Sequence, residues 1–356
     1  MLHESIARVG NLLNKTSLKI IVTGGLGYIG SHVTTLLLEK GYEVVCVDNL
    51  CNSRREVIDG IETITGKRPI FEKTDVSNDK QVEALFEKHP DIDGIIHFAA
   101  LKSVSESVDE PIKYYKNNIG GLLTILEHIT KKTVPLIFSS SCTVYGQASV
   151  LPINEKAPLQ TPSSPYGFTK QIGEQIIQDA CRTNDGFDSI LLRYFNPIGA
   201  HPSAQIGEYP LGIPQNLVPF LTQTVIGKHS VLKVFGSDYD TPDGTCIRDY
   251  IHVMDLALAH IDALDYLLES KNKNSCEIFN VGTGRGVSVL ELLKAFEKAT
   301  GVKVPYELSP RRAGDTVVAY AEVSKITKEL GWKAKYSLEQ ALESAWKWEQ
   351  HIQEVL

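Results

Sequence analysis

The sequence predicts an α/β protein built around a parallel β-sheet, followed by a smaller α/β region. Short, continuously apolar segments alternate with helix-like segments in the first half of the chain, and a glycine-rich turn joins the first such segment to the first helix. Apolar runs without polar alternation are typical of strands buried on both faces. Their regular alternation with helices indicates βαβ units and therefore a parallel sheet.

The elements can be placed in order along the chain. Residues 19–23 form the expected first strand, residues 24–30 the turn, and residues 31–40 a helix that ends at Gly41. Further strands are expected at 43–48, 69–72, 94–100, 134–140 and 189–194. Further helices are expected at 113–131, 289–300 and 337–351.

A change in composition after residue 196 predicts a domain boundary. Glycine and proline are dense between residues 197 and 219, and the later elements are shorter and more mixed. We expect an N-terminal extension at 1–17, a sheet domain at 18–196 and a mainly substrate-binding α/β domain at 197–356, with residues around 248–264 returning to the sheet domain. A ligand would then lie against the carboxyl ends of the sheet strands.

Composition and charge argue against several function classes. The net charge of −7 disfavours general nucleic-acid binding, and the chain has no run of about 18 apolar residues that would predict a membrane span. The six cysteines show neither CxxC nor zinc-finger spacing, so we expect reduced thiols and no metal centre. Residues 1–17 lack the continuous apolar core of a signal peptide, and we therefore expect a cytoplasmic protein.

The glycine-rich turn has the pattern of a dinucleotide-binding loop. Gly25–Gly30 reads G-x-G-x-x-G, follows a predicted strand, opens a predicted helix and precedes Asp48 by 18 residues. Glycines permit a tight turn with close backbone approach, and the helix N-terminus offers unpaired N–H groups and partial positive charge to a pyrophosphate. This context predicts a Rossmann-type, doubly wound nucleotide-binding domain.

Asp48 indicates which dinucleotide binds. A carboxylate at the end of the second strand accepts hydrogen bonds from ribose hydroxyls and repels a 2′-phosphate, which favours NAD over NADP. Arg54 and Arg55 follow Asp48 by six and seven residues, and a nearby arginine could accommodate a 2′-phosphate and so weaken that preference. Asp75, after the third strand, either brackets the adenine or is a surface turn residue.

A second set of residues has the chemistry of proton transfer. Tyr166 and Lys170 are four residues apart and share one face of a helix, while Ser141 follows a predicted strand. Tyrosine has a pKa of about 10 in water, and a nearby ammonium together with an oxidised nicotinamide lowers that pKa. Tyr166 could then accept a proton from a sugar hydroxyl that Ser141 also hydrogen-bonds.

With both sets in place, the chain resembles the extended short-chain dehydrogenase/reductase superfamily and, within it, the UDP-glucose 4-epimerase family. The resemblance runs from about residue 19 to near residue 350. The stretches that carry it are 23–30, 47–50, 97–102, 114–118, 138–145, 164–170, 193–202, 212–219, 243–255 and 310–315.

The resemblance implies a set of contacts to NAD and to a UDP-sugar. The implied NAD contacts are Gly24, Gly27, Tyr28, Ile29, Gly30, Asp48, Asn49, Asn52, Ser53, Asp75, Val76, Phe98, Ala99, Ala100, Lys102, Asn117, Ser139, Tyr166, Lys170 and Tyr194. The implied substrate contacts are Lys102, Ser141, Tyr166, Asn196, Asn216, Leu217, Phe235, Arg248, Arg312, Asp315 and Ala319. His97 is expected to be structural.

The resemblance also implies a reaction. Tyr166 removes the C4 hydroxyl proton while the C4 hydride moves to NAD, with Ser141 and Lys170 assisting; the 4-keto sugar then turns over and receives the hydride on its other face. Interconversion of UDP-galactose and UDP-glucose results. Dehydratase and decarboxylase relatives often carry a threonine followed by acids where this chain has Ser141-Cys142-Thr143. This chain lacks an acid there, which favours epimerisation over 4,6-dehydration.

Ala319 bears on sugar specificity. Members restricted to glucose and galactose nucleotides have a tyrosine at the aligned position, so the small side chain predicts room for a 2-acetamido group and activity on UDP-GalNAc and UDP-GlcNAc. A shift of one residue in the alignment would place Tyr320 there and reverse this prediction.

Other readings stay open at this point. The chain could epimerise another UDP-sugar, such as UDP-glucuronate, or act as a non-catalytic NAD(H)-binding sensor. Many members of the resembled family dimerise through two helices beside the sheet, and residues 109–130 and 168–182 are the candidates for a homodimer.

Overall fold

The structure is a computed structural model that describes residues 17–312 and 315–355. Nearly all of the expected N-terminal extension at 1–17 lies outside the described residues. The described chain forms two compact units. The first unit contains residues 17–144, 162–193 and 257–279, and the second contains residues 145–161, 194–256 and 280–355.

The first unit is built on a seven-stranded sheet with the order β11-β6-β5-β4-β1-β2-β3. Its strands are β1 Lys19–Thr23, β2 Glu43–Asp48, β3 Ile70–Lys73, β4 Gly94–His97, β5 Leu136–Ser139, β6 Ser189–Tyr194 and β11 Cys276–Val281. The pairs from β3 through β6 are all parallel, as predicted from the continuously apolar segments. The strand order reverses between β1 and β4, and ligands bind beyond the carboxyl ends of the strands at such a point.

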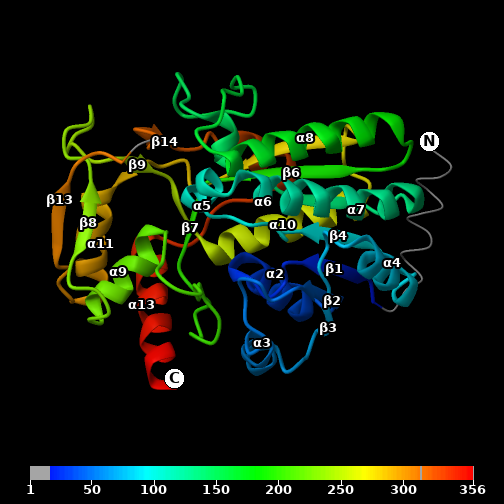
Figure 1. The fold of residues 1–356 in the computed structure, drawn as a ribbon, viewed down its shortest axis with the longest axis horizontal. Helices are drawn as coiled ribbons and strands as arrows, with labels where there is room; N and C mark the ends of the chain where they lie inside the picture. Colours follow the sequence, from blue (N-terminus) through cyan, green and yellow to red (C-terminus); the bar gives the residue numbers. More distant parts are fainter. Residues whose placement is uncertain (1–16, 313–314, 356) are drawn as a thin grey trace. The chain divides into compact units, whose positions relative to one another are not determined.

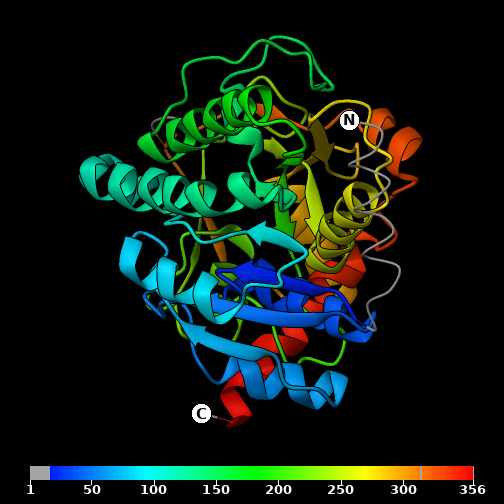
Figure 2. The same cartoon turned by 90° about the vertical axis from the view of Figure 1, so that its right-hand side faces the viewer.

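Helices cover both faces of this sheet. They are α2 Tyr28–Glu39, α3 Val57–Thr65, α4 Asp79–Lys88, α5 Val104–Asp109, α6 Pro111–Tyr114, the π-helical turn η1 Tyr115–Ile119, α7 Gly120–Ile129, the 3-10 turns η2 Thr130–Lys132 and η3 Cys142–Tyr145, α8 Pro165–Thr183 and α10 Val253–Leu268. On one face, α4, α7 and α8 share a buried apolar core with the strands, and α7 and α8 lie side by side (Figures 1 and 2). On the other face, Leu264 of α10 lies over Gly94 and Ile20.

The predicted helix at 113–131 is not continuous. The structure divides it into α6, η1 and α7, with the π-helical turn at Tyr115–Ile119. The wider turn carries Asn118, whose side chain bonds to Leu101 and Thr169. A π-turn inside a helix often accompanies a functional site, and the apolar periodicity of the sequence does not reveal it.

The described residues of the second unit form three small sheets and four helices. Its strands are β7 Asn196–Ile198, β8 Leu232–Phe235, β9 Ile247–Arg248, β10 Tyr250–His252, β12 Val287–Ser288, β13 Tyr306–Ser309 and β14 Val318–Ala319. Its helices are α9 Leu217–Val225, α11 Val289–Thr300, α12 Ser324–Leu330 and α13 Leu338–Val355. Leu221, Phe296 and Leu342 lie in one buried core that joins α9, α11 and α13.

Two further observations concern composition. All six cysteines lie in the described chain and none forms a disulfide there. Among the residues that the structure describes, no helix combines the length and apolarity needed to cross a membrane.

Candidate functional site

The loop between β1 and α2 is shaped for a backbone-bound ligand. The N–H groups of Gly24 and Gly25 donate to the carbonyl of Val47 at 2.7 and 3.4 Å, which folds the loop back onto β2. A Cβ at Gly30 would lie 2.2 Å from the Gly24 carbonyl oxygen, so no other residue fits there without moving the loop. No described side chain caps the N-terminus of α2. The N–H groups of the first helical turn and the helix dipole therefore suit a pyrophosphate.

Asp48 is the buried anchor of this loop as well as the candidate ribose acceptor. Its Oδ1 accepts hydrogen bonds from the N–H of Leu50 at 2.9 Å and the hydroxyl of Ser53 at 2.7 Å, and its Oδ2 accepts from the N–H of Leu26 at 3.1 Å. Leu50 holds a left-handed backbone conformation with φ of 63° to make this turn. A carboxylate offers about four acceptor positions, so capacity for a ribose hydroxyl remains.

Asp75 and Asn49 lie together beside the same strand ends. The side-chain amide of Asn49 donates to Asp75 at 3.3 Å, and the N–H and hydroxyl of Ser77 donate to its other oxygen. Burial raises the pKa of Asp75, but hydrogen bonds from Ser77 and Asn49 outweigh burial and hold that pKa below its usual value. These hydrogen bonds fix the orientation of the carboxylate within its turn. Val76 is buried next to it, and Asn52 is exposed.

The end of β4 is tied to β1 by a short chain of hydrogen bonds. His97 Nδ1 and Thr23 Oγ1 lie 2.9 Å apart, and the N–H of Ala99 donates to the same hydroxyl at 3.3 Å. Burial, with a smaller effect of the Lys170 charge, lowers the pKa of His97 to about 3. His97 is therefore neutral, and its Nδ1 shares one hydrogen bond with the Thr23 hydroxyl. This contact sets where Phe98 and Ala99 leave the sheet.

Asn118 holds the next part of that segment. Its side chain accepts from the N–H of Leu101 at 2.8 Å, donates to the Leu101 carbonyl at 3.0 Å, and donates to Thr169 of α8 at 3.1 Å. Asn117, the predicted contact, donates its own side chain to Asn118 at 2.9 Å. Asn118 is thus the residue that holds the loop bearing Lys102, a role that was not predicted from the sequence. The paired asparagines at 117 and 118 were the available signal.

The proton-transfer candidates lie at the end of β5 and on the first turns of α8. Helix α8 begins at Pro165, and the Ser164 hydroxyl caps it by accepting from the N–H of Gly167 at 3.2 Å. Tyr166 is 9 % exposed and Ser141 is 6 % exposed. The Ser141 hydroxyl oxygen accepts from the N–H of Thr143 at 3.2 Å, which leaves its own proton available to donate.

Lys170 is the cation of this set, and its surroundings shift its pKa. Its ammonium donates to the Ser139 carbonyl at 2.6 Å and lies 5.9 Å from the Tyr166 ring centre and 5.0 Å from that of Phe138. Burial lowers the pKa of Lys170 to about 8, and the charge of Glu174 partly opposes that effect. A cation held this close to a tyrosine favours the phenolate form.

In the second unit, Arg248 and Ala319 lie opposite each other. Strands β9 and β14 pair in parallel with Ala319 in register with Arg248, whose guanidinium donates to the Ile247 carbonyl at 2.9 Å. Ala319 is 8 % exposed. The Tyr320 ring instead packs against Gly286, where an added Cβ would lie 3.2 Å from the ring.

Asp249 fixes this part of the second unit. Its buried carboxylate accepts from the N–H and hydroxyl of Thr283 at 2.8 and 2.6 Å, from the N–H of Gly284 at 3.0 Å and from the N–H of Ala321 at 3.1 Å. Burial raises the pKa of Asp249, and these hydrogen bonds oppose the rise. One side chain therefore joins the segments that carry Arg248 and Ala319.

The predicted uridine contacts lie near the end of β8. Arg312 donates to Asp315 at 2.6 Å, and its guanidinium lies 5.7 Å from the ring centre of Phe235. Phe235 is 40 % exposed, so its ring is available for stacking.

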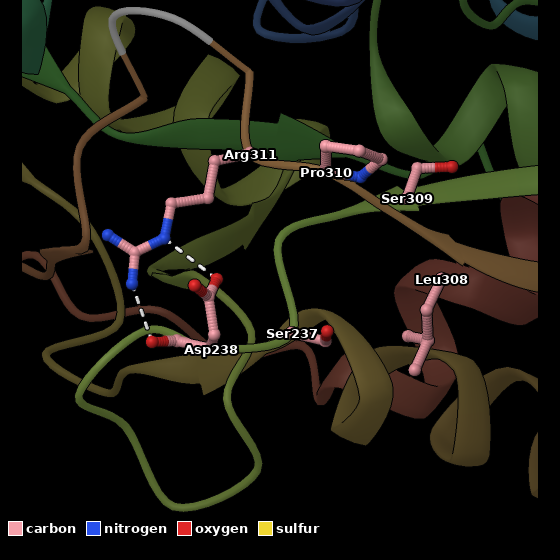
Figure 3. A pocket seen from close by; sticks show the side chains of 6 residues that line it. All are labelled: Ser237, Asp238, Leu308, Ser309, Pro310 and Arg311. Carbon is pink, nitrogen blue, oxygen red and sulfur yellow. Dashed lines mark hydrogen bonds and ion pairs between the residues drawn. The ribbon is translucent and has the colours of Figure 1, made fainter.

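The neighbouring Arg311 takes a different direction. Figure 3 shows it turned toward Asp238 at the side of a pocket of about 470 Å³. It donates to the Asp238 carboxylate at 2.8 Å and to the Asp238 carbonyl at 2.5 Å, while its guanidinium lies 4.3 Å from the Tyr239 ring centre. Of the two adjacent arginines, Arg312 is therefore the one beside Phe235.

The remaining predicted contacts begin or adjoin elements of the second unit. Tyr194 ends β6, and the N–H of Asn196 on β7 donates to the Asp249 carbonyl at 2.9 Å. Asn216 precedes α9 and donates its side chain to Glu208 at 2.8 Å, and Leu217 is the first residue of that helix.

Comparisons with known proteins show the family of this chain. Residues 21–345 match the family model described as GDP-mannose 4,6 dehydratase. A UDP-glucose 4-epimerase of Dictyostelium discoideum is 50 % identical over 332 residues, which cover 93 % of this chain and 95 % of that protein.

Solved structures give the same result. A UDP-glucose 4-epimerase of Stenotrophomonas maltophila, with bound NAD and formylated UDP-arabinopyranose, matches with a TM-score of 0.91 and 44 % identity over 95 % of this chain and all (100 %) of that one. A UDP-Glc/GlcNAc 4-epimerase of Campylobacter jejuni matches with a TM-score of 0.80 and 39 % identity over 94 % of this chain and 100 % of that one. The chain therefore belongs to the UDP-glucose 4-epimerase family of extended short-chain dehydrogenases/reductases.

Proposed function

We propose that this protein is an NAD-dependent isomerase that interconverts UDP-galactose and UDP-glucose by inverting C4. The observation that carries the proposal is the buried Lys170 ammonium, which donates to the Ser139 carbonyl beside Ser141 and one helical turn from Tyr166. A pure NAD-binding protein has no need for a desolvated cation next to a tyrosine. The family relation supports the same reaction.

The first unit would bind NAD. The loop after β1 offers backbone N–H groups to the pyrophosphate, and the absence of a Cβ at Gly30 lets the helix pack tightly against the Gly24 carbonyl. Asp48 would accept a ribose hydroxyl, and its charge disfavours the 2′-phosphate of NADP. When bound, NAD supplies a hydride acceptor that returns the hydride within each turnover.

The acid–base roles follow from charge and position. Tyr166 would accept the proton of the C4 hydroxyl, because the Lys170 ammonium stabilises the phenolate that performs this step. Ser141 would donate a hydrogen bond to the same sugar oxygen. On return of the hydride, Tyr166 would give the proton back, so no acid or base is consumed.

The second unit would hold the nucleotide part of the substrate. Arg248 and Arg312 are suited to phosphate oxygens, because a guanidinium donates in pairs. Phe235 would lie against the uracil, and Asp315 would accept from the uridine ribose. Asn196, Asn216 and Leu217 would contact the diphosphate or the sugar. Binding energy from these remote groups restrains a keto sugar while it turns over.

We propose further that N-acetylated sugars are substrates. Ala319 is small, buried and in register with Arg248, so a larger substituent on the sugar could be accommodated beside the phosphate contact. The packing of Tyr320 against Gly286 supports Ala319, rather than Tyr320, as the gate. The Campylobacter jejuni relative, whose name includes both UDP-Glc and GlcNAc, supports this wider specificity.

We also propose a cytoplasmic homodimer formed through residues 109–130 and 168–182. Three large apolar side chains on these segments are exposed to solvent: Ile112 (65 % exposed), Leu123 (43 %) and Phe168 (43 %). Contact with a second copy of the chain would cover them.

Proton NMR of UDP-galactose mixed with UDP-GalNAc, incubated with the purified protein without added NAD, tests these proposals. Formation of both gluco products supports resident NAD, C4 epimerisation and the small gate. UDP-glucose alone contradicts the wider specificity. No conversion, even with added NAD, contradicts the epimerase and favours another UDP-sugar, such as UDP-glucuronate, or a binding role.

A further inference from the structure

A buried ion pair lies beneath the end of β5. Arg193 of β6 donates from Nε to Glu174 Oε1 at 2.9 Å and from Nη2 to Oε2 at 2.6 Å. The Ser140 hydroxyl donates to Glu174 Oε1 at 2.5 Å. The three residues are 3 %, 1 % and 0 % exposed. Every charge of the cluster is therefore removed from water.

Stability alone does not account for such a cluster. Removing two charges from water costs more than most ion pairs regain, and apolar residues of similar volume often stabilise a fold as well or better. The position of the cluster suggests a different role. Ser140 lies between Ser139, whose carbonyl binds Lys170, and Ser141, the proposed hydrogen-bond donor to the sugar.

We propose that Arg193, Glu174 and Ser140 are positioning residues that hold the Ser139–Ser141 segment against α8 in the geometry of the proton-transfer step. This inference rests on the roles proposed above for Ser141, Tyr166 and Lys170. Arg193 holds the Glu174 carboxylate, Glu174 holds the Ser140 hydroxyl, and Ser140 holds the peptide that presents Ser141.

The hydrogen bonds form a continuous attachment along the segment. Lys170 and Glu174 are four residues apart and share one face of α8. They bind two consecutive residues of the strand end, Ser139 through its carbonyl and Ser140 through its hydroxyl. The N–H of Ser140 donates to Leu192 of β6 at 3.0 Å, so the segment is held from the sheet side as well.

Glu174 also acts on the charge of Lys170. Burial lowers the pKa of Lys170, and the Glu174 carboxylate opposes that fall. The bidentate contact with Arg193 keeps this carboxylate oriented inside the protein. The position of Ser140 and the protonation of Lys170 therefore both depend on Glu174.

The decisive comparison is between Ser140→Ala and Ser189→Ala. Both serines are fully buried, and the Ser189 hydroxyl donates to the Leu136 carbonyl at 2.9 Å at the opposite end of β5. Each substitution deletes one buried hydroxyl near an end of β5 and the hydrogen bond that it donates. Only Ser140→Ala removes a contact next to Ser141.

We expect Ser140→Ala to lower kcat for UDP-galactose roughly 10- to 100-fold with KM changed less than about 3-fold, because a displacement of about 1 Å in a reacting group has an effect of this size. Ser189→Ala should keep wild-type kcat and KM. Equal kcat in the two variants overturns the positioning role. A wild-type protein that leaves UDP-galactose unchanged instead overturns the proposed function, and the positioning role falls with it.

A pH profile separates positioning from general loss of structure. Glu174→Gln removes the charge that supports the Lys170 ammonium, so the alkaline decline of kcat should move to lower pH, while the profile of Ser189→Ala should not move. An unmoved profile in an active Glu174→Gln variant contradicts the electrostatic part. Because Glu174→Gln leaves Arg193 buried without a counter-charge, Ser140→Ala decides the question if that variant does not fold.

Discussion

The substitution Gly30→Ala would test the nucleotide-binding loop most directly. The added Cβ would lie 2.2 Å from the Gly24 carbonyl oxygen, 2.9 Å from Gly25 Cα and 3.0 Å from the Gly24 carbonyl carbon. All three atoms belong to the backbone, so no side-chain rotation relieves the overlap. The loop must move by about 1 Å or more to restore ordinary contact distances.

The size of the effect follows from two opposing contributions. Alanine is favoured over glycine within a helix by about 1 kcal/mol. Overpacking of a rigid site costs about 1–3 kcal/mol, and a backbone clash lies at the upper end. We therefore expect Gly30→Ala to lower the free energy of unfolding by about 1–2 kcal/mol and to weaken NAD binding at least tenfold, which corresponds to about 1.4 kcal/mol.

Gly120→Ala provides the matched control. Gly120 begins α7 with helical φ and ψ of −55° and −51°, and an added Cβ there meets no atom within 4 Å. This variant should be as stable as wild type or more stable by up to about 1 kcal/mol. Urea unfolding at a fixed NAD concentration measures the stability of each variant, and the NAD content of the purified proteins measures NAD binding. Equal stability and equal NAD content in the two variants would refute the argument from the close approach of Gly30 to Gly24.

Four further predictions concern charge and specificity. Because burial lowers the pKa of Lys170 to about 8, kcat should decline above about pH 8 as the ammonium is lost, and a flat profile to pH 9.5 would contradict its role. In the folded protein the pKa of Lys170 lies below its ordinary 10.5, so burial of the charged ammonium lowers the free energy of unfolding by roughly 3 kcal/mol below pH 8. Denaturation experiments at increasing pH should therefore show the free energy of unfolding rise by this amount between pH 8 and 10.5. Asp48→Ala leaves three donors without their acceptor and should lower the free energy of unfolding by about 2–3 kcal/mol along with NAD affinity, as calorimetric titration would measure; unchanged affinity would remove Asp48 from the site. Ala319→Tyr should abolish conversion of UDP-GalNAc while retaining that of UDP-galactose, and Tyr320→Ala should leave the sugar preference unchanged; equal loss for both sugars would reject a selective gate.

Local structure was largely predictable where one physical signal dominates. Strands β1, β2 and β6 and helix α11 have the predicted bounds. Each strand has an apolar centre of three or four residues, and α11 begins with a capping box between Ser288 and Glu291 and ends at Gly301, whose φ is 73°. The fold class and the family relation followed from such segments and from the motifs between them, and both are confirmed.

The predicted ends of elements were wrong where a side chain forms hydrogen bonds with the backbone or interrupts a regular helix. The strand predicted at 94–100 ends at His97, because the N–H of Ala99 bonds to the Thr23 hydroxyl. The helix predicted at 113–131 contains a π-helical turn built around Asn118. In both places the partner lies more than 15 residues away in the chain, and hydrophobic periodicity within a window carries no information about it.

The sequence by itself determined the chemistry available to this protein: glycines where a backbone must approach a ligand, an acid at the end of the second strand, and a tyrosine and a lysine one helical turn apart. These signals are local, so neighbouring residues suffice to reveal them. The tertiary structure alone decided the environment of those groups. It buries Lys170 against the Ser139 carbonyl and supplies hydrogen-bond donors to both carboxylate oxygens of Asp48. It also places the Arg193–Glu174 ion pair next to Ser140. The pKa of a lysine and the orientation of a serine depend on desolvation and on partners brought from distant segments, and only the folded chain brings those partners together.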